Sequence, residues 1–236
     1  MREYNAGSRL LAQLAGAIDL ARHRIRLKDG FYGPFNGQRK RITIVEAIVA
    51  NGDFGCAVET GTFRGTTTKF LSDRFPRVVS IEINPRYVAF ARLRMRKRRN
   101  VEIVEGDSAA ELAPILRRLE RGKPIFAYLD AHWGNLPLTP ELRALEESSL
   151  DYVAAIDDFE VPGDAGYGFD MHGKRGAIGP ALVFDAAPRL RRVWTPAAPS
   201  DVETGSMRGT GFLASPKMEP MLEALERSIL LRPVLR

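Results

Sequence analysis

Short apolar runs that end in an acidic residue recur along the middle of the chain. The acids that end the first four runs are Glu59, Glu82, Asp107 and Asp130. They stand 23 to 25 residues apart, which is enough for one β-strand and one returning helix. A fifth run, YVAAIDD, follows and ends in two further acids. Because parallel strands end at the same edge of a sheet, we expect all these carboxylates along one edge.

The segments between the apolar runs have the features of helices. The expected helices cover residues 66–75, 85–98, 108–120 and 139–148. Capping residues or an N1 proline mark several starts, at Asn84-Pro85, Asp107-Ser108 and Thr139-Pro140. The runs themselves are continuously apolar, as strands buried on both faces require. The pattern therefore predicts an α/β fold with a mostly parallel sheet.

The two ends of the chain are less regular. The first 26 residues predict an amphipathic helix with Leu10, Leu11, Leu14, Ile18 and Leu20 on one broad face. A glycine-rich segment at 31–38 follows, either a lid over a ligand or a fixed surface loop, and residues 42–52 predict another helix. After a long glycine-rich loop at 160–176, we expect a helix at about 177–187, strands near 191–195 and 209–215, and a final helix from residue 219. Without a linker, residues 1–236 predict one domain, with residues 1–50 packed on it.

The first apolar run leads into a glycine-containing turn, ETGTFRGTTT. Gly61 and Gly65 allow a sharp turn and a close approach to a ligand. A dinucleotide site would have G-x-G-x-x-G, but this turn has the larger residues Thr62 and Phe63. The acid before the turn, Glu59, suits a cationic ligand better than a phosphate.

The next two acids have their own candidate roles. Glu82 ends the second run, where a carboxylate can accept hydrogen bonds from both hydroxyls of a ribose. Asp107, before Ser108, either receives an adenine amino group or caps the following helix. The three acids together with the glycine turn are more specific than any one of them.

The motifs AVETGTFRGTTT, EGDS, YLDAHWG and IDDFEVPGDAGYGFD resemble the class I S-adenosylmethionine-dependent methyltransferases, and in layout the metal-dependent O-methyltransferases. The resemblance implies a three-layer, Rossmann-like α/β sandwich with a seven-stranded sheet and a reversed last strand. It also implies the residues that bind S-adenosylmethionine. Those residues are Glu59, Gly61, Thr62, Phe63, Gly65 and Thr66 for the methionine part, Glu82 for the ribose, and Asp107 and Ser108 for the adenine.

A second group of acids suggests a metal site. Asp130, Asp157 and Asp158 end two strands expected to be neighbours, and oxygen ligands of this kind suit Mg²⁺ or another divalent cation. Such a metal would lower the pKa of a bound hydroxyl and orient it toward the methyl group. With Asp130, His132 is the catalytic candidate: it is either the general base or, with Trp133, a residue that supports the pocket.

Composition limits the remaining possibilities. The formal charge is +6 and the pI about 9.7, with basic clusters at 22–41 and 92–99 that could mean nucleic acid or an anionic substrate. No aromatic residue interleaves with the second cluster, and the chain has neither an added RNA-binding module nor an N/D-P-P-Y/F motif for base methylation. We therefore do not expect nucleic acid as the partner. A lone cysteine and the lack of a long apolar segment favour the reducing cytoplasm and no membrane partner.

The prediction is thus an S-adenosylmethionine-dependent methyltransferase that methylates an oxygen of a small hydroxylated molecule with the help of a metal. Two alternatives remain: a metal-dependent hydroxylase or other enzyme on the same fold, and an RNA-directed methyltransferase. A homo-oligomer is compatible with the amphipathic first helix.

Overall fold

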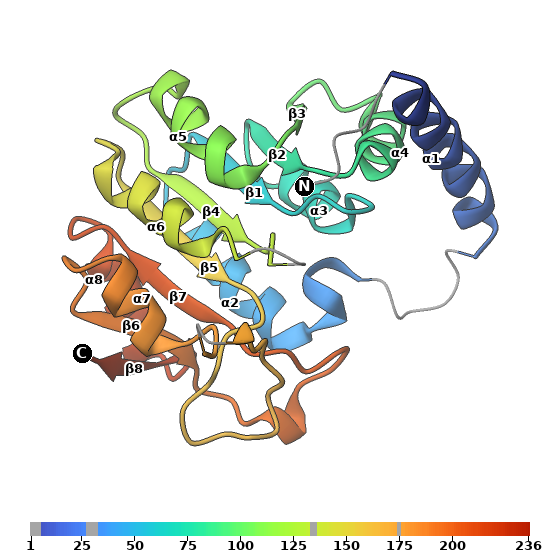
Figure 1. Cartoon of the computed structure of the whole chain (residues 1–236). Helices are drawn as coiled ribbons and strands as arrows, with labels where there is room; N and C mark the ends of the chain where they lie inside the picture. Colours follow the sequence, from blue (N-terminus) through green and yellow to red (C-terminus); the bar gives the residue numbers. More distant parts are fainter. Residues whose placement is uncertain (1–5, 27–32, 133–135, 174–175) are drawn as a thin grey trace.

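An eight-stranded sheet forms the centre of the molecule in a computed structural model that describes residues 6–26, 33–132, 136–173 and 176–236 (Figure 1). The strands are β1 (Cys56–Thr60), β2 (Val78–Glu82), β3 (Val101–Glu105), β4 (Ile125–Leu129), β5 (Tyr152–Ile156), β6 (Arg192–Pro196), β7 (Gly211–Ala214) and β8 (Leu231–Leu235). Their order across the sheet is β3-β2-β1-β4-β5-β7-β6-β8. All five residues of β1, β2, β4 and β5 are buried, which explains their continuous apolar character.

The first five strands are parallel, and their carboxyl ends lie along one edge, as the spacing of the acids predicts. β7 runs antiparallel to its neighbours β5 and β6, and β8 runs antiparallel to β6. The Rossmann-like α/β fold with a reversed late strand is therefore confirmed. The eighth strand was not expected, since the predicted elements end with the helix from residue 219, and it contains a proline, Pro233. An edge strand tolerates a proline, since one side of it needs no hydrogen bonds.

Helices cover both faces of the sheet and make three layers (Figure 1). The helices are α1 (Ala6–Arg26), α2 (Arg39–Ala50), α3 (Thr66–Ser72), α4 (Pro85–Met95), α5 (Ser108–Arg118), α6 (Leu138–Glu147), α7 (Pro180–Ala186) and α8 (Glu219–Arg227), with short 3₁₀ turns η1 (Pro34–Gly37) and η3 (Ser200–Val202). One core cluster joins α5, α6 and α7 to one sheet face through residues such as Leu112, Leu142 and Val183. The other joins α2, α3 and α8 to the opposite face.

The first helix, α1, packs on α4 rather than on the sheet. At the crossing, a Cβ atom on Gly16 would lie 2.3 Å from the carbonyl oxygen of Arg86, so only glycine allows this approach. Leu20 is buried there, whereas Leu10, Leu11, Leu14 and Ile18 are more than half exposed. The helix is confirmed, but most of its predicted apolar face points to solvent.

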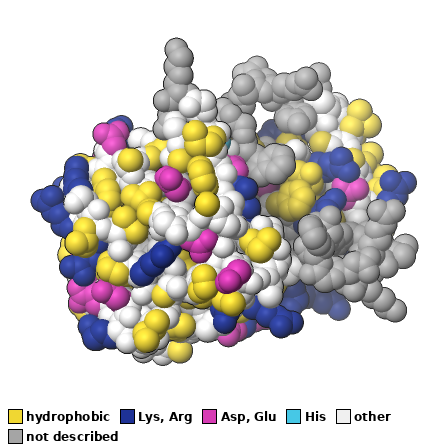
Figure 2. All heavy atoms as spheres, turned by 90° about the horizontal axis from the view of Figure 1, so that it is seen from below, with side chains coloured by type: hydrophobic (Ala, Val, Ile, Leu, Met, Phe, Trp, Pro, Cys, Tyr) yellow, Lys and Arg dark blue, Asp and Glu magenta, His cyan; other side chains and the backbone are white. Residues whose placement is uncertain are grey.

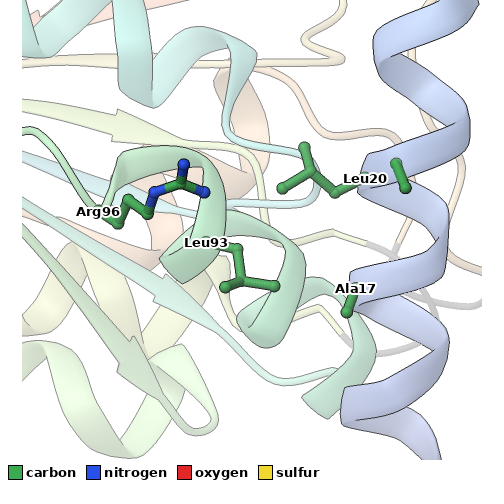
Figure 3. A pocket seen from close by; sticks show the side chains of 5 residues that line it. Ala17, Leu20, Leu93 and Arg96 are labelled. Carbon is green, nitrogen blue, oxygen red and sulfur yellow. The ribbon is translucent and has the colours of Figure 1, made fainter.

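A small apolar pocket lies between these two helices (Figure 3). Ala17, Leu20, Ala21 and Leu93 line it, with Arg96 at its side. Because α4 begins after the carboxyl end of β2 and returns toward the amino end of β3, its last turn lies away from the acid-bearing edge. This pocket is therefore separate from the candidate site. In the described part of the chain, no helix combines the length and apolarity needed to cross a membrane.

Candidate functional site

Glu59 is the penultimate residue of β1, and its side chain is almost fully buried. The hydroxyls of Thr68 and Ser80 both donate to its Oε2 atom at 2.5 Å. Burial, reinforced by the nearby charge of Glu82, raises the pKa of Glu59 to about 7. The carboxyl group thus ties the start of α3 to β2, and its predicted contact with a cationic ligand would have to use the other oxygen.

The turn from Gly61 to Gly65 packs tightly against the end of β4. Gly61 has a φ of +83°, and a Cβ atom there would lie 2.3 Å from the carbonyl oxygen of Asp130. Thr62 is buried and hydrogen-bonds to Ser80, while Gly65 precedes α3 with a φ of +67°. The Thr66 hydroxyl accepts a hydrogen bond from Arg94 on α4, so it does not cap the helix itself. The glycines are needed for the close approach that the sequence predicts.

Glu82 ends β2 and is buried beside this turn. Its Oε2 atom accepts the backbone N–H of Phe63 at 2.7 Å, and its Oε1 atom accepts that of Asn84 at 2.8 Å. Burial raises the pKa of the carboxyl group. Each carboxylate oxygen can accept a second hydrogen bond, so the residue is both positioned and able to receive two hydroxyls.

Two apolar side chains beside Glu82 are exposed. Ile83 is 49% exposed and Phe63 44%, although both belong to the well-packed edge of the sheet. Phe63 also contacts Tyr87 edge to face, with ring centroids 4.5 Å apart. Exposed apolar groups next to the acid that is predicted to bind ribose suit a planar base. Ile83 was missed from the sequence, where it reads as a continuation of the strand.

Asp107 and Ser108 stand at the start of α5. Asp107 accepts the backbone N–H of Ala109 through Oδ1 at 3.0 Å, as an N-cap does. The capping alternative is therefore present in the structure, and it leaves Oδ2 for the predicted adenine contact. Ser108 is buried and faces Glu141 of α6, a residue that the sequence analysis does not single out.

Glu141 lies in the first turn of α6. It is completely buried, and neither carboxyl oxygen has a well-formed hydrogen bond to the described residues, although the hydroxyls of Ser108 and Thr60 face it. Burial raises its pKa from 4.5 to about 7, with the two hydroxyls partly offsetting the rise. The sequence held a signal: Glu141 shares the i, i+3, i+4, i+7 face of the buried leucines 138, 142 and 145.

Replacing Glu141 by glutamine should stabilise the protein at pH 8 but change little at pH 5. An acid with a raised folded pKa favours the native state below its unfolded pKa, and this advantage is lost as the pH rises from 4.5 to about 7. The full shift corresponds to about 3 kcal/mol, and the unpartnered amide of glutamine reduces the expected gain to about 1–2 kcal/mol. Urea unfolding at the two pH values measures the difference. Equal effects at pH 5 and pH 8 would show that Glu141 does not titrate in this range.

The three acids expected to bind a metal are arranged differently from a metal centre. Asp157 is fully buried and forms an ion pair with Arg41, with Oδ1 and Nη1 2.6 Å apart. Asp158, in a left-handed conformation at φ +54°, pairs with Arg208 instead. Asp130 is half-buried, and burial together with the charges of the other two acids raises its pKa well above the usual range. The residues that the structure describes contain no group of three potential ligands placed to hold a metal.

The magnesium site and the metal-dependent layout are therefore not supported. The physical reason is that guanidinium groups already neutralise two of the three carboxylates. A divalent cation would have to displace the buried guanidinium of Arg41 and the half-buried guanidinium of Arg208 in order to bind there. Asp130 remains the one acid of the three with no arginine paired to it among the described residues.

His132 is buried, and its Nε2 atom lies 3.1 Å from the carbonyl oxygen of Leu129. Burial lowers its pKa to about 4, so the ring is neutral at pH 7, and Nδ1 has no partner among the described residues. A base this weak removes a proton poorly, and the geometry favours the supporting alternative over the general base. Trp133 lies outside the described residues.

The segment considered as a lid is fixed where the structure describes it, from residue 33 onward. Phe35 is fully buried against the rings of Phe70 and Tyr128. Its backbone N–H donates to Thr67, and the side chain of Asn36 donates to Asp157 at 3.0 Å. The fixed-loop alternative therefore describes residues 33–38, while residues 31 and 32 lie outside the described part.

No protein-family model matches the chain. The ribosomal RNA small subunit methyltransferase A of Koribacter versatilis (strain Ellin345) is 38% identical over an alignment of 167 residues that covers 61% of this chain and 55% of that protein. The chain thus spans only about half the length of this curated relative. The S-adenosylmethionine-bound aminopentose methyltransferase of calicheamicin biosynthesis from Micromonospora echinaspora superposes with a TM-score of 0.50 at 15% identity, over 84% of this chain and 96% of the other. The fold is that of the class I methyltransferases.

The expectation that nucleic acid is not the partner is wrong, because the curated relative is named for ribosomal RNA. Two of its grounds were weak. Backbone phosphates need only cationic side chains, so a missing aromatic pattern or RNA-binding module excludes little. In addition, residues 135–138 read NLPL, a partial match to the motif whose absence was noted. Leu138 stands at its aromatic position and is buried, and Asn135 lies outside the described residues.

Proposed function

We propose, from the class I methyltransferase fold, that this chain transfers a methyl group from S-adenosylmethionine to RNA. The observation that carries the proposal is the 38% identity to a ribosomal RNA methyltransferase. That identity is much higher than the identity to the fold neighbour that acts on an aminopentose, at 15%. Methylation of a small hydroxylated molecule, which the motifs suggested, is the alternative that the experiment below tests in parallel.

The residues at the carboxyl edge fit S-adenosylmethionine. Glu82 offers acceptors for a vicinal diol, and Ile83 and Phe63 offer exposed apolar surface for a planar base. Gly61 removes the side chain that would fill the space between the turn and β4. When bound, the cofactor supplies an activated methyl group, and the chain's part is to orient the acceptor for in-line transfer.

Asp130 is the best candidate to take the proton that the acceptor releases. It stands at the end of β4, next to the Gly61 turn, and is partly open to solvent. Burial and the neighbouring acids raise its pKa, and a carboxylate with a raised pKa holds a proton more tightly than an ordinary one. His132 has the opposite shift and is less suited to that role.

The charge of the chain is compatible with RNA. The net charge is +6, and phosphate contacts depend on Lys and Arg side chains. On the face seen in Figure 2, cationic side chains are interspersed with acidic ones instead of forming one basic patch. We infer that RNA binding depends on Lys and Arg contacts to phosphates and weakens with salt.

The test is methyl incorporation from radiolabelled S-adenosylmethionine into purified small-subunit ribosomal RNA that lacks modifications. We expect incorporation with the wild-type chain and a loss of it in Asp130→Asn, which keeps the shape of the side chain but not its charge. Catechol, as a small hydroxylated acceptor, is assayed in parallel under the same conditions.

The outcomes separate the alternatives. Transfer to catechol but not to RNA would restore the small-molecule acceptor. Transfer to neither, together with no binding of S-adenosylhomocysteine in calorimetry, would remove the methyltransferase proposal and favour another enzyme on this fold. The binding of the protein to RNA should weaken as the salt concentration rises. Binding that does not depend on salt would contradict contacts to phosphates.

A further inference from the structure

Asp157 is held by four groups from four parts of the chain. Arg41 from α2 pairs with Oδ1, which also accepts the backbone N–H of Asp158. The Tyr128 hydroxyl from β4 donates to Oδ2 at 2.7 Å, and the Asn36 amide from η1 donates to the same oxygen at 3.0 Å. Both oxygens are therefore saturated inside the protein, and no water is needed to compensate the charge.

Arg41 is itself fixed in place. Its Nη2 atom donates to the carbonyl oxygens of Arg208 at 2.6 Å and Gly209 at 3.2 Å, and its side chain is 1% exposed. Glu203 accepts the backbone N–H groups of Lys40 and Arg41, which anchors the first turn of α2. Burial would lower the pKa of the guanidinium, but Asp157 raises it above its usual value, so Arg41 remains charged.

A second arginine compensates the neighbouring acid. Arg208 forms ion pairs with Asp158 and with Asp170 from the long loop. The edge that carries the DD pair therefore has its own two cations. Each cation comes from a segment far away in the sequence and is held there by backbone contacts or by a second acid.

We propose that Arg41 occupies the role of a divalent cation at this edge, so that the protein needs no metal. The inference rests on the proposed methyl transfer and adds to it that the acceptor is positioned by protein groups alone. The driving force is electrostatic: a buried carboxylate needs a cation, and a guanidinium with fixed donors supplies it permanently.

The experiment measures metal content and thermal stability of the full chain with EDTA, Mg²⁺ or Mn²⁺. We expect no bound divalent metal after purification and the same Tm in all three solutions. In Arg41→Ala, the Tm should fall and Mg²⁺ should raise it, because Asp157 then lacks its cation. The matched control is Arg39→Ala on the same helix, whose exposed side chain is not part of the cluster, and which should behave as wild type.

Stoichiometric metal in the wild type, or a Tm that falls with EDTA, would overturn the proposal. So would an Arg41→Ala protein that folds and does not respond to Mg²⁺. If Arg41→Ala does not fold, Arg41→Lys is used, which retains a cation and should fold with a Tm that Mg²⁺ does not change. A Tm of Arg41→Lys that rises with Mg²⁺ would contradict the proposal. These readouts do not depend on methyl transfer, so a failure of the proposed activity with unchanged Tm values is a separate result.

Discussion

Replacing Arg41 by methionine should lower the free energy of unfolding by about 3–5 kcal/mol, the usual cost of removing one partner of a buried ion pair. Methionine fills much of the volume, but Asp157 is left with only neutral donors from Tyr128, Asn36 and the Asp158 backbone. An uncompensated charge in a fully buried position is the source of the cost. Urea unfolding followed by circular dichroism measures it.

The double variant Arg41→Met/Asp157→Asn is the control for this effect. Without the carboxylate, the loss of the guanidinium leaves no buried charge, so the double variant should be more stable than Arg41→Met alone. The coupling energy from the double-mutant cycle reports the pair itself. A single-variant cost below about 1 kcal/mol would mean that the pair is open to water and behaves like a surface salt bridge.

Replacing Glu82 by alanine should weaken the binding of S-adenosylhomocysteine on the order of 10- to 100-fold. The variant loses the charged acceptor for the ribose hydroxyls, a contribution of about 1.5–3 kcal/mol. It also leaves the backbone N–H groups of Phe63 and Asn84 without their acceptor, which loosens the glycine turn. Calorimetric titration at constant pH measures the affinity.

Glu105→Ala provides the matched control. Glu105 is the register partner of Glu82 on the neighbouring strand β3, but its carboxylate pairs with Arg9 on α1. Its removal should leave the affinity unchanged. An equal loss in both variants would indicate a general disturbance of this edge, and normal binding by Glu82→Ala would place the ribose elsewhere.

Much of the site that we propose for S-adenosylmethionine consists of features that the sequence predicts. The even spacing of the apolar runs indicated parallel strands, and the acids at their ends had to share an edge. The glycine turn, Glu82 and the capping role of Asp107 lie where local sequence rules place them. These features depend on strand ends and helix starts, which residues close in sequence determine.

The acids at the ends of β4 and β5 were misread as a metal site for a physical reason. Three acids at neighbouring strand ends give the same sequence pattern whether they bind a metal ion or pair with arginines. Only the identity of the nearby cation distinguishes the two kinds of site. The cations here are Arg41 and Arg208, which no local pattern connects to Asp157 and Asp158. For Glu141, the sequence shows that it shares the buried face of its helix, but it does not show that no described residue forms a well-shaped hydrogen bond to its carboxyl group.

The sequence by itself determined the class of fold and the edge at which the acids meet, and it predicts Glu82 as the residue that accepts the ribose hydroxyls. Tertiary structure decided which of those acids remain free to act. Packing of η1 and α2 over the ends of β4 and β5 brings the buried guanidinium of Arg41 to Asp157, and the loop before β7 brings the half-buried guanidinium of Arg208 to Asp158. Charges interact over distances of a few ångströms in space, irrespective of separation along the chain, so their pairing becomes visible only in the folded protein.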